Sequence, residues 1–96
     1  MIRVKVGVVI AGLDVVGNIL EPACVADKIW AENNWGDVWI TSGIEGNHAA
    51  SSWHYRGLGI DLRLTPDKAR AVLLLAALLP NHRVLLEGDH IHIQPK

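Results

Sequence analysis

The chain of 96 residues has a single cysteine and almost no net charge, and each of these features excludes or disfavours certain kinds of site or partner. One cysteine, Cys24, excludes an internal disulfide and a cysteine-rich zinc site. We expect its side chain to be a small buried hydrophobe on a helix face. The net charge of −1 offers no basic surface for phosphate groups, so nucleic acid is not an expected partner.

The chain also lacks a long hydrophobic run. Its longest apolar stretch, AVLLLAALL at residues 71–79, is about half of the roughly 20 residues that span a bilayer, and it indicates a core helix. Near the N-terminus Arg3 and Lys5 precede apolar residues, but Asp14 interrupts them and no convincing cleavage site follows. We therefore expect no membrane span, no signal peptide and synthesis in the cytoplasm.

The length predicts a single domain over residues 1–96, because one modest hydrophobic core is all that such a chain can bury. The pattern of apolar residues predicts an α+β fold, a small antiparallel sheet with helices packed on one side. The expected elements are a strand within residues 3–10, a helix over 21–34, a strand over 37–43, a helix over 65–80 and a hairpin over 82–95.

Local signals mark the ends of these elements. Pro22 suits the first position of a helix, and the Asn and Gly residues within 33–36 end that helix. Thr65 is the expected N-cap of the second helix, which Pro80 stops. Gly-Asp at residues 88–89 favours a two-residue hairpin turn between two apolar runs.

The stretch SSWHYRGLGIDLR, residues 51–63, contains a first pair of candidate metal ligands. His54 and Asp61 are separated by a segment with Gly57 and Gly59, where the backbone can bend and bring the two side chains together. Imidazole and carboxylate are good zinc ligands, but two ligands do not hold a metal. A third ligand must come from elsewhere.

The last strand offers that ligand. His90, His92 and Gln94 project from one face, whereas Ile91 and Ile93 project from the other and enter the core. Alone, two such histidines are more often exposed polar positions on an amphipathic strand. Together with the bend, they give two imidazoles and one carboxylate, and three protein ligands with one open position is the pattern of a catalytic zinc site.

A catalytic zinc site also needs a carboxylate that takes a proton, and two candidates flank the histidines. If residues 88–89 form the turn, Glu87 lies directly across from His90 on the same face, which favours Glu87. Asp89 in a turn is more often a turn-former.

Two patterns resemble the superfamily of zinc D-Ala-D-Ala metallopeptidases, which shares its fold with the signalling domain of hedgehog proteins. The pattern S-x-H-x-x-G-x-x-x-D is followed about 30 residues later, beyond a helix, by D/E-x-x-H. The resemblance covers roughly residues 37–96 and is strongest to short phage-type members. The matched positions are Ser52, His54, Gly57 and Asp61 in the first pattern, and Asp89 and His92 in the second.

The resemblance implies a hedgehog/DD-peptidase-like fold, a Zn²⁺ cofactor and specific roles. His54, Asp61 and His92 would be the zinc ligands. Asp89 falls where active members of the superfamily keep their catalytic acid, which reverses the preference drawn from hairpin geometry. Glu87 is then the reserve.

Four further residues would contact the substrate or the transition state. His48 matches a histidine that lines the hedgehog cleft, and His90 matches one beside the metal. Ser52 would bind the substrate backbone, and Tyr55 would line the cleft. One feature of the superfamily is missing, because Ile44 and Glu45 follow the T-S-G strand end where many members have an arginine for the substrate carboxylate.

Arg56 and Arg63 are possible substitutes for that arginine, although surface charge is the more ordinary role for each. The resemblance thus implies hydrolysis of an amide bond in peptidoglycan stem peptides, by a phage or bacterial lysin that another factor releases to the cell wall. The enzyme would be an endopeptidase or a D-Ala-D-Ala carboxypeptidase.

The alternative is a catalytically inactive, zinc-stabilised binding domain like that of hedgehog proteins. In either case the helix over residues 71–79 is apolar all round, which suggests contact with a second copy of the chain.

Overall fold

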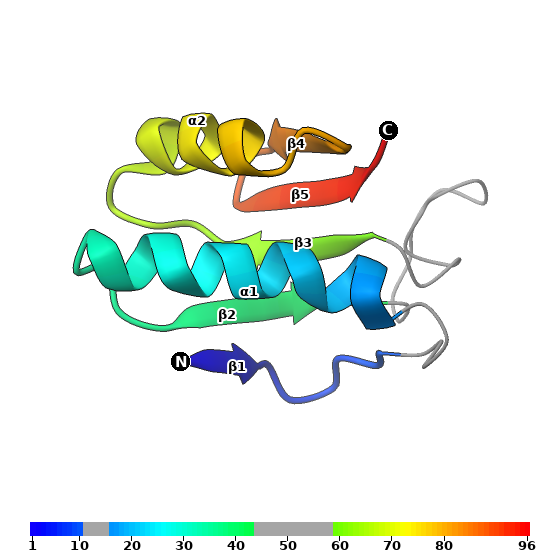
Figure 1. The fold of residues 1–96 in the computed structure, drawn as a ribbon. Helices are drawn as coiled ribbons and strands as arrows, with labels where there is room; N and C mark the ends of the chain where they lie inside the picture. The colour runs from blue at the N-terminus through cyan, green and yellow to red at the C-terminus, as the bar shows by residue number, and fades with distance from the viewer. Residues whose placement is uncertain (11–15, 44–58) are drawn as a thin grey trace.

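The computed structural model describes residues 1–10, 16–43 and 59–96, which form a five-stranded mixed sheet and two helices (Figure 1). The α+β class expected from the sequence is confirmed. No helix in these ranges is long and apolar enough to cross a membrane. The elements in chain order are β1 (Ile2–Val4), α1 (Val16–Glu32), β2 (Val38–Ser42), β3 (Ile60–Arg63), α2 (Lys68–Leu78), β4 (His82–Leu86) and β5 (His90–Pro95).

The strands lie in the order β1-β2-β3-β5-β4, and the sheet is not purely antiparallel as expected. β1 runs parallel to β2, with Val4 opposite Ile40, whereas the other neighbours are antiparallel. A parallel pair needs a crossover connection, and α1 lies within the connection between these two strands. β3 was not expected as a strand at all, because its four residues follow an irregular stretch and are too few to show a pattern.

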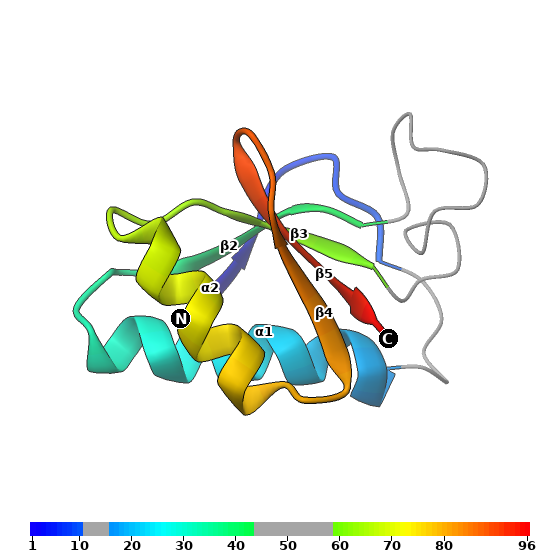
Figure 2. The ribbon, with the colours of Figure 1, turned by 90° about the horizontal axis from the view of Figure 1, so that it is seen from above.

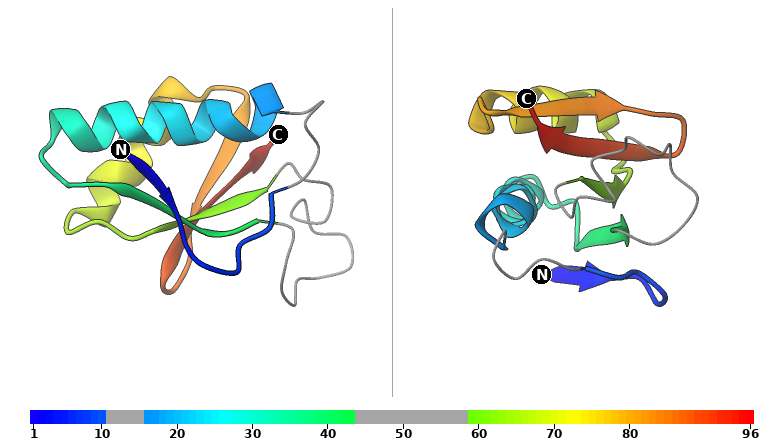
Figure 3. Two further views of the ribbon diagram at one scale, coloured as in Figure 1. Left: turned by 90° about the horizontal axis from the view of Figure 1, so that it is seen from below. Right: turned by 90° about the vertical axis from the view of Figure 1, so that its right-hand side faces the viewer.

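Both helices cover the same face of the sheet (Figures 2 and 3). The core fills the space between them, because one row of each inner strand is apolar and faces the helices. The opposite face carries polar residues and is not covered by either helix. The buried core residues are Ala23, Ala26, Ile29, Trp30, Val38, Ile40, Ile60, Leu62, Ala71, Leu75, Leu79, Ile91 and Ile93.

The first helix begins earlier than expected and ends as expected. It starts at Val16, so Pro22 lies inside it rather than at its first position. At its end Asn34 has a φ of 56°, its amide donates to the carbonyl of residue 31 at 3.3 Å, and the Trp35 amide donates to the Trp30 carbonyl at 2.9 Å. These are the two bonds of a Schellman motif. The Trp30 and Trp35 rings contact each other edge to face, with their centres 5.5 Å apart, and supply the hydrophobic contact of this motif.

The second helix is capped by Asp67, not by Thr65. The Asp67 carboxylate accepts a hydrogen bond from the Arg70 amide at 3.2 Å, which is the reach of an N-cap to the third helical residue. Thr65 is buried two residues before the cap, and its hydroxyl has no hydrogen-bond partner among the described residues. Both Thr65 and Asp67 are cap-forming types, so composition alone could not choose between them.

Two side chains lie in the opposite environment from the one expected. Cys24 is exposed, because the buried stripe of α1 runs through Ala23 and Ala26 and leaves Cys24 outside it. His82 follows the helix stop at Pro80 closely enough that the sequence predicts a solvated loop residue, but its side chain is buried. It opens β4, and its side chain lies on the face that the helices cover.

Candidate metal centre on the open face of the sheet

The register of two strands brings two of the predicted metal ligands together. β3 and β5 are antiparallel neighbours, and Asp61 lies directly opposite His92. Since Ile60, Leu62 and their partners enter the core, the alternation of the strands places Asp61 and His92 on the open face. Both residues are nevertheless buried, and His92 Nδ1 is 2.9 Å from Asp61 Oδ1.

The second ring nitrogen of His92 also faces an oxygen. Nε2 lies 2.7 Å from Gln94 Oε1, an acceptor two residues along the same strand and on the same face. The hydrogen bond to Asp61 is the main reason why the pKa of His92 is raised above its ordinary value, and the bond to Gln94 adds to it. Both contacts favour the protonated imidazolium, while burial opposes it.

A second imidazole, that of His90, is bordered by carboxylates. Its Nδ1 is 2.7 Å from Asp89 Oδ1, and its Nε2 is 3.7 Å from both Asp61 Oδ1 and Glu87 Oε2. The hydrogen bond to His90 lowers the pKa of Asp89 below its usual value, so this exposed carboxyl is ionised at neutral pH. His90 therefore links the buried Asp61 to the rim of the sheet.

The hairpin turn explains why two carboxylates gather at His90. The Glu87 amide donates to the His90 carbonyl oxygen at 3.0 Å, which closes the two-residue turn at residues 88–89. This confirms the turn predicted from the sequence. Glu87 lies across from His90 as expected, and Asp89 lies next to it in the turn.

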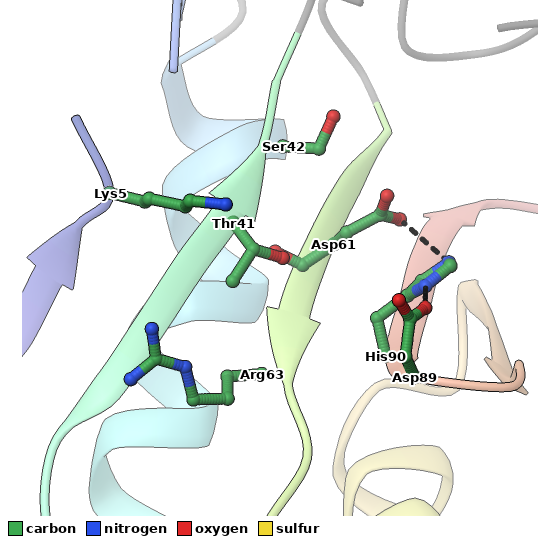
Figure 4. Close-up of a pocket in the computed structure, with 7 residues that line it drawn as sticks. All are labelled: Lys5, Thr41, Ser42, Asp61, Arg63, Asp89 and His90. Atoms are coloured by element: carbon green, nitrogen blue, oxygen red, sulfur yellow. Dashed lines mark hydrogen bonds and ion pairs between the residues drawn. The ribbon is translucent and has the colours of Figure 1, made fainter. Parts of the chain in front are cut away.

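An open pocket of about 400 Å³ lies over this part of the sheet (Figure 4). Asp61, Asp89 and His90 are on one side of it, while Lys5 and Arg63 lie on the side of β2. The pocket is thus acidic on one side and basic on the other. Its lining consists of Lys5, Thr41, Ser42, Asp61, Arg63, Asp89 and His90, and Glu87 is not part of it.

The sequence did not identify the residues on the basic side as site residues. Lys5 reaches the pocket because its backbone continues beyond β1 alongside β2, with its amide donating to the Ile40 carbonyl at 3.0 Å. Arg63, weighed above as a possible substitute for a missing arginine, lies with its guanidinium 4.6 Å from the centre of the Trp39 ring. The sequence predicted a strand around Lys5, but it did not predict the parallel pairing that places Lys5 beside β2.

The other predicted site residues lie outside the described part of the chain. These are the third proposed ligand, His54, and the proposed substrate contacts His48, Ser52 and Tyr55. Within residues 1–10, 16–43 and 59–96, no three His, Cys, Asp or Glu side chains are grouped so that they could hold a metal ion.

Two of the three predicted zinc ligands lie in the described part of the chain, and their donor atoms are of types that zinc binds. A carboxylate oxygen and an imidazole nitrogen converge at Asp61 and His92, and both donor types are ordinary zinc ligands. Gln94 holds the second ring nitrogen, as the outer-shell partner of a ligating histidine does.

No family model, no curated protein and no solved structure matches this chain. The protein is therefore classified by its fold and the geometry of its site. It is a small α+β domain in which the sheet face opposite the two helices holds a buried carboxylate–imidazole pair at the side of an open pocket.

Proposed function

We propose that the protein is a zinc-dependent peptidase that hydrolyses an amide bond in peptidoglycan stem peptides. It would belong to the superfamily of zinc D-Ala-D-Ala metallopeptidases, have their hedgehog-like fold and act at the cell wall after release by another factor. The observation that carries the proposal is the cross-strand pair of Asp61 and His92. Both residues were assigned as ligands from the two sequence patterns, and the sheet register makes them neighbours.

Asp61 and His92 would hold the metal together with His54, which the resemblance supplies as the third ligand. Zinc held there would polarise the scissile carbonyl and lower the pKa of water to roughly 7. Gln94 fixes which nitrogen of His92 is available, because its Oε1 accepts the hydrogen of Nε2 and leaves Nδ1 directed at Asp61.

Asp89 would act as the general base. Its carboxylate lines the pocket, is ionised at neutral pH and is held by His90 Nδ1. It would accept a proton from the attacking water at a carboxylate oxygen and donate that proton to the leaving amine. Glu87 contacts the same imidazole from outside the pocket lining, which supports Asp89 over Glu87.

The basic side of the pocket supports a carboxypeptidase over an endopeptidase. Neither Lys5 nor Arg63 contacts a carboxylate among the described residues, so their charges are available to a ligand. A peptide with its scissile amide near Asp61 and His90 would direct the group beyond that bond towards β2. A terminal carboxylate there would be bound by charge-assisted hydrogen bonds.

The assignment of the base is tested by two matched substitutions. We expect Asp89→Asn to lower the rate of amide hydrolysis by about 100-fold or more, the usual contribution of a positioned base, with zinc content unchanged. Glu87→Gln serves as the control and should retain most of the activity. Hydrolysis of a stem-peptide substrate and metal content are measured on the same samples. Full activity of Asp89→Asn with loss in Glu87→Gln would transfer the role to Glu87.

A further inference from the structure

The outer edge of the sheet is formed by β4, at the opposite end from β1 (Figure 3). Backbone hydrogen bonds join Glu87 to His90 and residue 81 to residue 96. Hydrogen-bonded pairs alternate along an antiparallel ladder, so the backbone N–H and C=O groups of residues 83, 85 and 87 point towards β5. The backbone groups of Val84 and Leu86 therefore point outward. Within the described ranges no strand pairs with them.

Apolar side chains accompany this edge on both faces of the sheet. Leu85 is exposed on the open face, and Leu86 is exposed on the face of the helices. α2 packs against β4 and adds two exposed leucines, Leu78 and Leu73, the latter with 72% of its surface accessible. An exposed strand edge with apolar neighbours is a template for pairing with another strand.

We propose that two copies of the chain pair through β4, antiparallel and about a twofold axis at Leu85. In this register Leu85 faces Leu85 of the second copy, and Val84 faces Leu86. Both members of the Val84–Leu86 pair have outward backbone groups, so they can exchange the two hydrogen bonds of a ladder pair. The two sheets would then continue into one.

Charge complementarity selects this register. It places Arg83 of each copy opposite Glu87 of the other, on the same face as Leu85. A shift of the axis to Val84 would oppose Arg83 to Leu85, and a shift to Leu86 would oppose Leu85 to Glu87. Of these three axes, only the one at Leu85 pairs Arg83 with Glu87 and also places apolar side chains opposite each other on both faces of the sheet. Because Arg83 and Glu87 of one chain are about 13 Å apart along the strand, they can pair only between copies.

The dimer would bring each copy to the border of the other's pocket. Glu87 lies 3.7 Å from His90, so Arg83 of the second copy would bind the carboxylate next to that imidazole. If the proposed peptidase function holds, this contact engages Glu87 in an ion pair between copies and leaves Asp89, which is held by His90 Nδ1, as the base. The pairing itself does not depend on that function, since it rests on the edge of β4 alone.

The test is a charge exchange followed by light scattering at a series of protein concentrations. The unaltered chain should reach twice its monomer mass of 10.5 kDa. Arg83→Glu and Glu87→Arg should each raise the dimer dissociation constant roughly tenfold or more, because like charges then face each other twice. An equimolar mixture of the two variants should recover the dimer, since both opposed positions then carry opposite charges. Circular dichroism confirms that each variant is folded.

A second measurement covers the case in which a charge variant fails to fold. Leu85→Cys, in a Cys24→Ser background, should form a covalent dimer on oxidation, because a pair at the axis has Cα atoms about 4.5 Å apart. Leu73→Cys in the same background should crosslink less. A monomer at every concentration, or a dimer that neither charge variant weakens, would overturn the proposal.

Discussion

At the scale of single residues, the Asp61–His92 pair explains how two ionisable groups can be buried on a sheet face. His92 Nδ1 and Asp61 Oδ1 are 2.9 Å apart, and Gln94 Oε1 forms a hydrogen bond with the other ring nitrogen of His92. Removal of one partner would take from the other a short contact to an ionisable group, which destabilises a buried pair. A metal ion held by the same atoms would replace the shared proton and keep both groups satisfied.

The basic side of the pocket gives a prediction about substrate ends. Replacing Lys5 and Arg63 together with alanine should raise KM for a stem peptide with a free terminal carboxylate by about tenfold or more, the loss expected for charge-assisted hydrogen bonds. The same peptide with an amidated terminus should be affected little. Steady-state kinetics on the two peptides measure the difference.

Arg70→Ala is the matched control for that experiment, because Arg70 is an exposed arginine on α2, on the covered side of the sheet. Equal losses on the acid and the amide peptide would show that Lys5 and Arg63 do not recognise the carboxylate.

Sequence reasoning at the residue scale selected several side chains that lie near one another in the structure, and their role in metal binding stays a prediction. Asp61, His90 and His92 were chosen because imidazoles and carboxylates at such spacings suggest metal chemistry, and the structure brings all three together. Lys5 was not chosen, because a lysine near a strand is ordinarily surface charge. Only the pairing of two distant segments gives it a place beside the pocket.

At the scale of elements, the end of α1 depends on Asn34 in the left-handed region. Asn34→Ala should lower the free energy of unfolding by about 1 kcal/mol, because a Cβ without a local hydrogen-bonding group is strained there. Asn34→Gly should leave the stability unchanged or raise it. Urea denaturation followed by tryptophan fluorescence measures both. An equal loss in the two variants would show that the Asn34 side chain, rather than its backbone conformation, is what matters.

Elements with local signals were predicted best. The turn at residues 88–89, the end of α1 and the second helix depend on neighbours in the sequence, and the structure confirms them. β3 and the parallel pairing of β1 with β2 depend on contacts between segments far apart in the chain. No local pattern encodes such contacts, so the sheet was expected to be antiparallel throughout. The early start of α1 was missed because Pro22 resembles a helix start.

At the scale of the whole molecule, both described helices pack on one face of the sheet, and neither of them covers the other face. That face joins β3 to the C-terminal hairpin through the Asp61–His92 contact. A metal at this contact would therefore tie the middle of the chain to its end. In a chain of this length, such a link is a substantial part of the folding free energy.

The most direct test measures the release of new amino groups from purified peptidoglycan, with zinc content determined on the same sample and His92→Ala as the control. We predict about one zinc ion per chain, with release that is abolished in the control. The absence of zinc from a folded, active protein would contradict the metal centre. Zinc at about one per chain without release from any wall type would contradict the peptidase and favour a zinc-stabilised binding domain.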